Sequence, residues 1–500
     1  MAVTGVSPTL APLIQSVLDL NNRLTDLQTQ LSTGMKSQTF AGLGPQSGVV
    51  ASLNAQVAAM SSYDDTITTA GTNLSLVQNV LQQISSIAST VQNSTTAPDF
   101  TIDATGQTSA QQTARQQLDQ ILSMLNSQGG TGYLFSGTGV DQASVDSADH
   151  ILDGNGAQAG LTQVIKERNE ADVGVGGMGR LVVPAAAGST VSVNEDVAGS
   201  PFGLKLAGVN STLTGASVSG PSGSPAAISV SLAGNPNAGD TVTYTFALPD
   251  GTSQTLTLTA TTSATPGPNQ FTIGGTPGAT AVNLQAALTA GIKQIAATSL
   301  PAASAMAAAN NFFDDPPQRV AGPSPFTGAT ALTNGTAANT VIWYTGENGA
   351  GSVRSTALAR VDPNTTVAYG TRANEQGIRW IVQNIATLAA TTYSASDPNA
   401  PASYAALNTR VYSALAVPQG VQSISDIQAS LANAQNAMNA AKTRHQQTSA
   451  TLTDMLQSIE GVDTYQVGAQ ILSLQTSLSA SLSTTARMAQ LNLLNFLPPA

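Results

Sequence analysis

Apolar residues recur in steps of three and four at both ends of the chain, a spacing that is typical of amphipathic helices. Near the N-terminus these positions are Leu10, Leu13, Val17, Leu20, Leu24, Leu27 and Leu31. Near the C-terminus they are Val467, Ile471, Leu474, Leu478, Leu482 and Met488. The pattern predicts one helix at each end. Each helix carries an apolar stripe that another surface must cover.

Two longer helices are predicted next to these, from Val49 to Val91 and from Ile424 to Ile459, because the same spacing continues through both segments. The stretch before Pro98 should end the first, and Gly461 the second. Their polar positions are mostly Gln, Asn, Ser and Thr, so helix-stabilising ion pairs are scarce. We therefore expect a mainly α fold, in which both chain ends form a long antiparallel coiled-coil bundle. His445 lies in the apolar stripe, where we expect a neutral, hydrogen-bonded core histidine.

The middle of the chain has a different pattern. Gly, Pro, Ser and Thr dominate between about residues 131 and 370, where the helical spacing disappears. Alternating apolar residues on both sides of Asp250-Gly251 predict a β-hairpin, and the alternation in 228–232 predicts a further strand. Residues 278–300 predict a short helix. This region is therefore expected to be an inserted β-rich (α+β) outer domain.

These patterns divide the chain into five regions. They are an N-terminal assembly helix (1–45), the N-terminal part of a helical core (46–130), the outer domain (131–370), the C-terminal part of the core (371–460) and a C-terminal assembly helix (461–500). Within the core, shorter helices are expected at 114–125 and 378–388. Because the outer domain is expected to contact mostly itself, removal of residues 190–340 should leave assembly intact.

Composition narrows the possible functions. Of the 500 residues only 9% are charged, and the net charge is −11. No stretch is basic enough to coat a phosphate backbone, so we expect no nucleic-acid partner. No apolar run is long enough to span a bilayer, so we expect no membrane insertion. Cysteine is absent and the two histidines lie far apart in sequence, which argues against a metal site or cofactor and predicts that the protein is not an enzyme.

One glycine-rich motif needs separate treatment. Residues 174–179, Gly-Val-Gly-Gly-Met-Gly, match the dinucleotide-binding pattern, which requires a strand before it and a helix after it. Here the charged segment 166–172 precedes the motif and a strand-like segment, 180–184, follows it. We interpret the motif as a turn between strands. Asp314 and Asp315, followed by two prolines, predict an exposed loop rather than paired catalytic acids.

Both ends of the chain resemble the bacterial flagellin family. Residues 24–34, which end in Gln-Leu-Ser-Thr-Gly, are similar to the family's first helix, and residues 470–481 with Ala486-Arg487-Met488 resemble its closing helix. The resemblance covers roughly residues 10–130 and 370–497. One departure is the turn after Gly34, where Thr39–Pro45 replaces the family's Ser-Pro-Ala-Asp-Asp type of sequence.

The resemblance implies a structural subunit of the bacterial flagellum that polymerises through its terminal helices and supports motility. The implied partners are further copies in an axial polymer, other axial proteins (hook-associated proteins and flagellin), an export chaperone and the flagellar export apparatus. The location would be extracellular, on the flagellum, and we expect export without a cleavable signal peptide. The residues assigned to subunit assembly are Leu20, Leu24, Leu27, Leu31, Ile471, Leu474, Leu478 and Leu482.

Two kinds of flagellin-family subunit fit these features. Residues 129–137 and 490–497 resemble hook-associated subunits at the hook-filament junction, the assignment that we favour. Residues 237–244 resemble an insert of some long filament flagellins, so a major or minor filament flagellin is the alternative. A secreted coiled-coil adhesin is a remote third possibility, in which the outer domain would be the working part.

Overall fold

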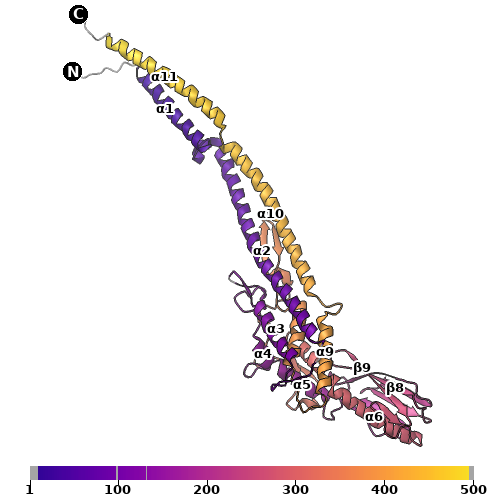
Figure 1. Cartoon of the computed structure of the whole chain (residues 1–500). Helices are drawn as coiled ribbons and strands as arrows, with labels where there is room; N and C mark the ends of the chain where they lie inside the picture. The colour runs from indigo at the N-terminus through magenta and orange to yellow at the C-terminus, as the bar shows by residue number, and fades with distance from the viewer. Residues whose placement is uncertain (1–9, 97–98, 131, 495–500) are drawn as a thin grey trace. The chain divides into compact units, whose positions relative to one another are not determined.

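The computed structural model describes residues 10–96, 99–130 and 132–494, and these form two compact units. Unit 1 comprises the described residues of Met1–Thr69, Ala359–Val367 and Asn436–Ala500, and unit 2 those of Ala70–Leu358 and Ala368–Gln435. Two long helices, α2 (Ser47–Ser94) and α10 (Ile424–Glu460), contribute residues to both units (Figure 1).

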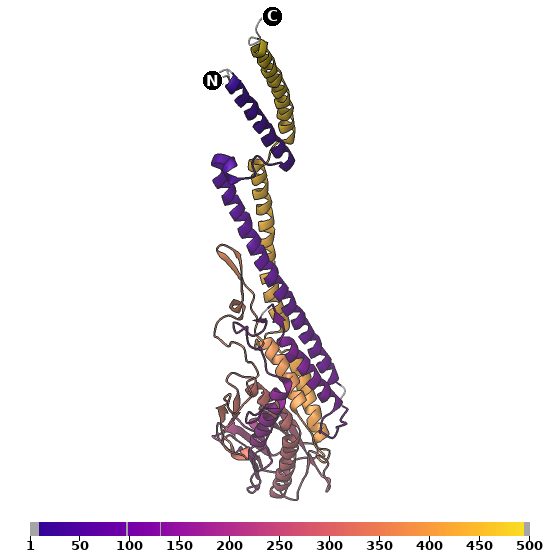
Figure 2. The ribbon, with the colours of Figure 1, turned by 90° about the vertical axis from the view of Figure 1, so that its left-hand side faces the viewer.

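Unit 1 consists of antiparallel helix pairs and one small hairpin. Helix α1 (Leu10–Thr33) lies beside α11 (Thr464–Leu494), and the first part of α2 lies beside the last part of α10 (Figures 1 and 2). The α2–α10 pair encloses a core of Val50, Leu53, Leu452 and Leu456. The hairpin consists of β13 (Leu358–Asp362) and β14 (Thr365–Ala368), and its residues 359–367 belong to this unit.

The helical part of unit 2 is built around the remaining turns of α2, which bury Leu74, Leu81, Ile84 and Val91. The other helices are α3 (Ser109–Leu125), α4 (Ala148–Asp153), α5 (Leu161–Val173), α7 (Ser299–Phe312), α8 (Gln376–Ala390) and α9 (Ala400–Leu415). Helix α3 starts at a capping box, because the Thr108 hydroxyl accepts from the Gln111 N–H while the Gln111 side chain accepts from the Thr108 N–H.

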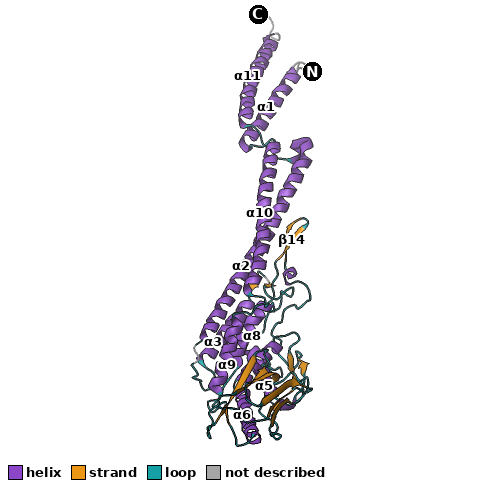
Figure 3. Ribbon diagram, turned by 90° about the vertical axis from the view of Figure 1, so that its right-hand side faces the viewer, coloured by secondary structure: helices purple, strands orange, loops and turns teal. Residues whose placement is uncertain are grey.

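The β part of unit 2 contains two four-stranded sheets, in the orders β10-β9-β8-β5 and β3-β4-β7-β6 (Figure 3). Helix α6 (Pro277–Ala297) packs against both sheets and shares their core. The strands are β3 (Leu181–Val182), β4 (Thr190–Glu195), β5 (Lys205–Ser211), β6 (Ala216–Ser222), β7 (Ala227–Leu232), β8 (Thr241–Ala247), β9 (Ser253–Thr261) and β10 (Gln270–Thr272). Two small pairs, β1 (Gln128–Gly129) with β2 (Gly132–Tyr133) and β11 (Gln318–Val320) with β12 (Leu332–Asn334), complete the unit.

The structure confirms a mainly helical fold with an inserted β-containing region. The hairpin around Asp250-Gly251 is β8–β9, and the predicted strand at 228–232 is β7. Supercoiling of the helix pairs and the five-region division stay predictions. Ala97, Pro98 and the predicted C-terminal stretch 495–497 lie outside the described residues.

One prediction for the middle of the chain is wrong, and its helices were predicted incompletely. Besides α6, the region 131–370 contains α4, α5 and α7, which the sequence spacing did not reveal. The glycine-rich motif does not join two strands: it follows α5, whose C-cap is Gly174, and leads into β3. Sequence spacing missed α5 because the helix turns charged residues into the interior as ion pairs, including Arg168 with Asp172 at 2.8 Å.

Candidate assembly surface

Helix α1 carries the N-terminal apolar stripe and ends where Gly34 adopts a positive φ of 72°. A left-handed residue after the last turn is a common helix stop, and glycine adopts it without a Cβ clash. The N–H of Gly34 still donates to the carbonyl of Gln30 at 2.8 Å. The Gln-Leu-Ser-Thr-Gly sequence therefore forms a helix C-terminus.

Helix α10 ends next to the end of α1. Gly461 follows α10, and the backbones of Met35 and Gly461 form an antiparallel bridge, in which the N–H of Val462 donates to the carbonyl of Gly34 at 3.0 Å. The Lys36 ammonium donates to the carbonyl of Ile459 at 2.7 Å. These bonds hold the C-terminal end of α1 next to the N-terminal end of α11.

The predicted assembly residues lie on both helices of the α1–α11 pair, and their burial is incomplete. On α1, Leu20, Leu24 and Leu27 are half-buried, whereas 42% of Leu31 is exposed. On α11, Ile471 is buried, Leu474 and Leu478 are half-buried, and 50% of Leu482 is exposed. Among the α1 side chains that the structure describes, none is buried. Within the described residues, burial on this pair is limited to Val467 and Ile471 near the start of α11.

A second set of apolar side chains on the same helices is exposed, and the sequence analysis did not assign it. Leu472 is 67% exposed, Leu18 50% and Ile14 49%. A signal for Leu18 and Ile14 was present, because each directly follows a stripe position, Val17 or Leu13, and so widens the stripe. Exposed apolar side chains gathered on one element mark a surface for association more often than single ones do.

Charge is sparse on this surface. Helix α1 carries Asp19, Arg23 and Asp26, and α11 carries Arg487 alone. The remaining polar positions are mostly Ser, Thr, Asn and Gln, and several hydroxyls, such as Thr29 and Thr476, bond to the helix backbone four residues earlier. A surface of this kind can be covered by another helix without burying unpaired charges, which would be costly.

The segment 129–137, which resembles junction subunits, has a packing role in unit 2. Phe135 is fully buried, and its carbonyl accepts from the N–H of Ala373 at 2.8 Å. The Thr371 hydroxyl donates to the carbonyl of Leu134 at 2.7 Å. These contacts tie the end of the N-terminal helices to the start of the C-terminal ones.

The glycine-rich loop and the paired acids take ordinary structural positions. Val175 in the loop is 86% exposed, and no helix follows Gly179 as a phosphate site would require. Asp314 and Asp315 are exposed, as predicted, and Asp314 pairs with Arg379 at 3.1 Å. Within the described residues no cluster of metal-ligating side chains occurs, and no helix there is long and apolar enough to cross a membrane.

Comparisons with known proteins identify no family for the chain. No protein-family model matches it, and neither does any curated protein. A crystal structure of FlgL from Xanthomonas campestris matches it at 11% sequence identity with a TM-score of 0.24, over 85% of this chain and 99% of that one. A TM-score this low supports no conclusion about fold or function.

Proposed function

We propose that the protein is a structural, non-catalytic subunit that polymerises through α1 and α11, as an axial component of the bacterial flagellum. The observation that carries the polymerisation is the incomplete burial of the α1–α11 pair. A lone pair of helices covers only one side of each, and here apolar side chains remain exposed on both. Further copies of the same pair would cover them. The flagellar assignment is supported by the sequence resemblance of residues 24–34 and 470–488.

The test uses substitutions that spare the single chain. Leu18→Gln with Leu472→Gln removes two side chains that are at least half exposed, so the folded monomer should keep its stability. Polymer formation, followed by sedimentation and electron microscopy, should fall strongly because these side chains lose apolar burial between copies. Matched controls are Gln28→Asn and Gln475→Asn, which change exposed polar residues on the same helices. Normal polymers from the double leucine variant would contradict the proposal.

Within this class, we favour a position at the hook-filament junction over a filament flagellin. The support is the resemblance of residues 129–137 and 490–497 to junction subunits. Quantitative mass spectrometry of sheared filaments and of purified hook-basal bodies separates the two. Enrichment with the hooks is expected, whereas the bulk of filament mass would identify a filament flagellin.

The proposed partners follow from the same assignment. They are other axial proteins, an export chaperone and the flagellar export apparatus, and the proposed location is outside the cell. An adhesin would differ in one measurable way, because its binding would survive removal of α1 and α11. For an axial subunit that removal should abolish incorporation into the flagellum and motility.

A further inference from the structure

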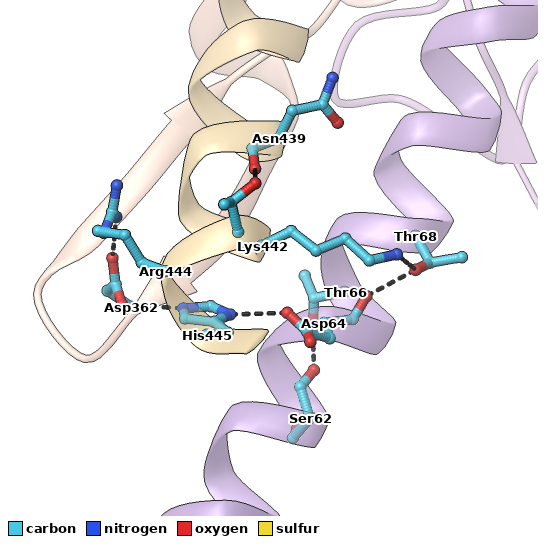
Figure 4. Close-up of polar contacts among 10 residues, drawn as sticks. Ser62, Asp64, Thr66, Thr68, Asp362, Asn439, Lys442, Arg444 and His445 are labelled. Carbon is cyan, nitrogen blue, oxygen red and sulfur yellow. Dashed lines mark hydrogen bonds and ion pairs between the residues drawn. The ribbon is translucent and has the colours of Figure 1, made fainter. Parts of the chain in front are cut away.

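His445 lies where three segments of unit 1 meet: α10, which carries it, α2 and the β13–β14 hairpin (Figure 4). Its Nδ1 is 2.7 Å from an Asp64 carboxylate oxygen on α2, and its Nε2 is 3.0 Å from an Asp362 carboxylate oxygen on β13. The side chain is only 5% exposed. One imidazole ring thus bridges two carboxylates from different segments.

The number of N–H donors that the site requires bears on the charge of this ring. A neutral imidazole has one N–H, so it donates to one carboxylate and turns a lone pair toward the other. An imidazolium donates to both. Because Asp64 and Asp362 both face ring nitrogens at hydrogen-bond distance, the doubly protonated form satisfies the site. The geometry therefore favours a charged ring over the neutral core histidine expected from the sequence, whereas the predicted burial and hydrogen bonding are confirmed.

Further charged and titratable groups reach the site from each of the three segments. On α10, Arg444 pairs with the second oxygen of Asp362 at 2.8 Å, and Lys442 donates to the Thr68 hydroxyl at 3.3 Å. On α2, the Tyr63 ring lies 6.0 Å from the imidazole. On the hairpin, Arg360 donates to the Pro363 carbonyl.

These neighbours change the proton affinities of the site. Burial alone would lower the pKa of His445, but its hydrogen bonds to Asp64 and Asp362 and the charges of both raise that pKa above 6.5. The hydrogen bond from His445 lowers the pKa of Asp362 below 3.8, against the opposing effect of burial.

We propose that His445 is a proton-operated clasp that holds the β13–β14 hairpin on the α2–α10 helix pair. The hairpin also contributes Ala359 and Val361, both buried, but Asp362 supplies its charged attachment to the helices. When the imidazolium loses its proton, one carboxylate faces a lone pair and the attachment weakens. Docking is then strongest between the pH at which Asp362 is protonated, below 3.8, and the pH at which His445 loses its proton, above 6.5. The inference concerns the single chain and does not depend on the proposed function.

The sign of the pH dependence follows from the raised pKa of His445. Below 6.5, and above the pH at which Asp362 is protonated, the ring is charged whether the hairpin is docked or released, and docking has its full strength. Above 6.5 the released form loses its proton first, so the equilibrium constant for release rises by about tenfold per pH unit. The rise ends once the pH passes the pKa of the docked form.

The experiment uses the full-length monomer and two independent readouts. Carbon-13 labelling of histidine ring Cε1 gives NMR signals for the two histidines of the chain, and His150→Gln identifies which is His445. A nitroxide on Thr365→Cys, an exposed hairpin position in a chain without cysteine, reports hairpin mobility by electron spin resonance. The same label on Gln447→Cys, exposed on α10, is the helix control.

The proposal expects His445 to titrate above 6.5 and the Thr365 label to become mobile over that same pH range, while the Gln447 label does not change. His445→Gln should leave the hairpin mobile at every pH, because an amide cannot donate to carboxylates on opposite sides. Asp362→Asn, at a partly exposed position, should also loosen the hairpin and should lower the pKa of His445.

Three results would overturn this proposal. They are a titration of His445 at or below 6.5, label mobility that does not follow that titration, and release of the hairpin at neutral pH by Arg444→Gln alone. The last result would assign the attachment to the exposed arginine instead of the histidine.

Discussion

The backbone N–H of Lys36 donates to the carbonyl oxygen of Glu460 at 2.6 Å, so the short segment after α1 is bonded to the last residue of α10. The Lys36 ammonium also reaches the last turn of α10, where the helix dipole favours a positive charge. The helix ends at Gly34 and Gly461 are thus linked by backbone hydrogen bonds into one join. Changes to the α1–α11 pair beyond this join should leave the α2–α10 core intact.

The first prediction concerns the half-buried stripe. Leu27→Asp or Leu478→Asp places a carboxylate between α1 and α11, at a cost of about 2–5 kcal/mol if the charge cannot reach water. We expect loss of polymer formation, measured by sedimentation, with unchanged urea unfolding of unit 2. Gln28→Asp puts the same charge on an exposed neighbour and should assemble normally. Polymers from the Leu27→Asp variant would show that the stripe makes no subunit contact.

The second prediction compares two adjacent valines on α2. Val50 is fully buried in the α2–α10 core, whereas Val49 is 51% exposed. Val50→Ala should lower the free energy of unfolding of unit 1 by about 2 kcal/mol, from lost apolar burial and the cavity left behind. Val49→Ala should change it by less than about 0.5 kcal/mol. Hydrogen exchange of peptides covering residues 448–459 measures both, and equal effects would place the core elsewhere.

Sequence spacing predicted the helices that have one apolar face, and it failed where a helix is buried on most sides. Helix α7 is rich in alanine, and buried residues such as Ala303, Ser304 and Ala308 occupy much of its circumference, which leaves no periodic contrast. The stripe residues Leu20 to Leu31 could be assigned to a pairing face. Their exposure could not, because it depends on how much of each side chain α11 covers.

The contacts of His445 with two carboxylates could not be predicted from the sequence, for a related reason. Asp64 comes close to His445 through the antiparallel register of α2 and α10, which apolar spacing does not fix to the residue. Asp362 arrives on a hairpin from the glycine- and serine-rich middle, 83 residues away in sequence. No local pattern links either carboxylate to the histidine.

The third prediction corrects the expected deletion. Removing residues 190–340 would delete α7, whose side chains fill the interior of unit 2, so we expect that variant to misfold. A deletion of 184–297 spares α7. Gly179 packs against the Leu300 side chain, so residues close to the two ends of the deletion are near each other, and we would join the ends with a short Gly-Ser linker. Circular dichroism should show retained helices and electron microscopy retained assembly for the shorter deletion, and unfolding of both variants would contradict this.

The fourth prediction is a pH dependence of unit 1. Since the pKa of His445 is raised in the folded chain, its contribution to stability is complete below 6.5 and is lost as the pH rises through the folded-state value. Urea unfolding monitored on unit 1 should show wild type more stable than His445→Gln at pH 6, with a smaller difference at pH 9. A difference that does not change with pH would mean that the ring stabilises the site without a charge.

The bond between Asp64 and His445 spans 381 residues of sequence. Bringing such distant positions of a flexible chain together costs about 5 kcal/mol of loop-closure entropy, beyond a constant term. Unit 2 holds Gln78 of α2 within 3.4 Å of Gln435 of α10 by itself. Once unit 2 has folded, the remaining turns of both helices start from neighbouring positions, and most of that entropy has already been lost. The helix pairs of unit 1 should therefore be the last part of the chain to fold, and a chain whose middle is unfolded should form neither pair.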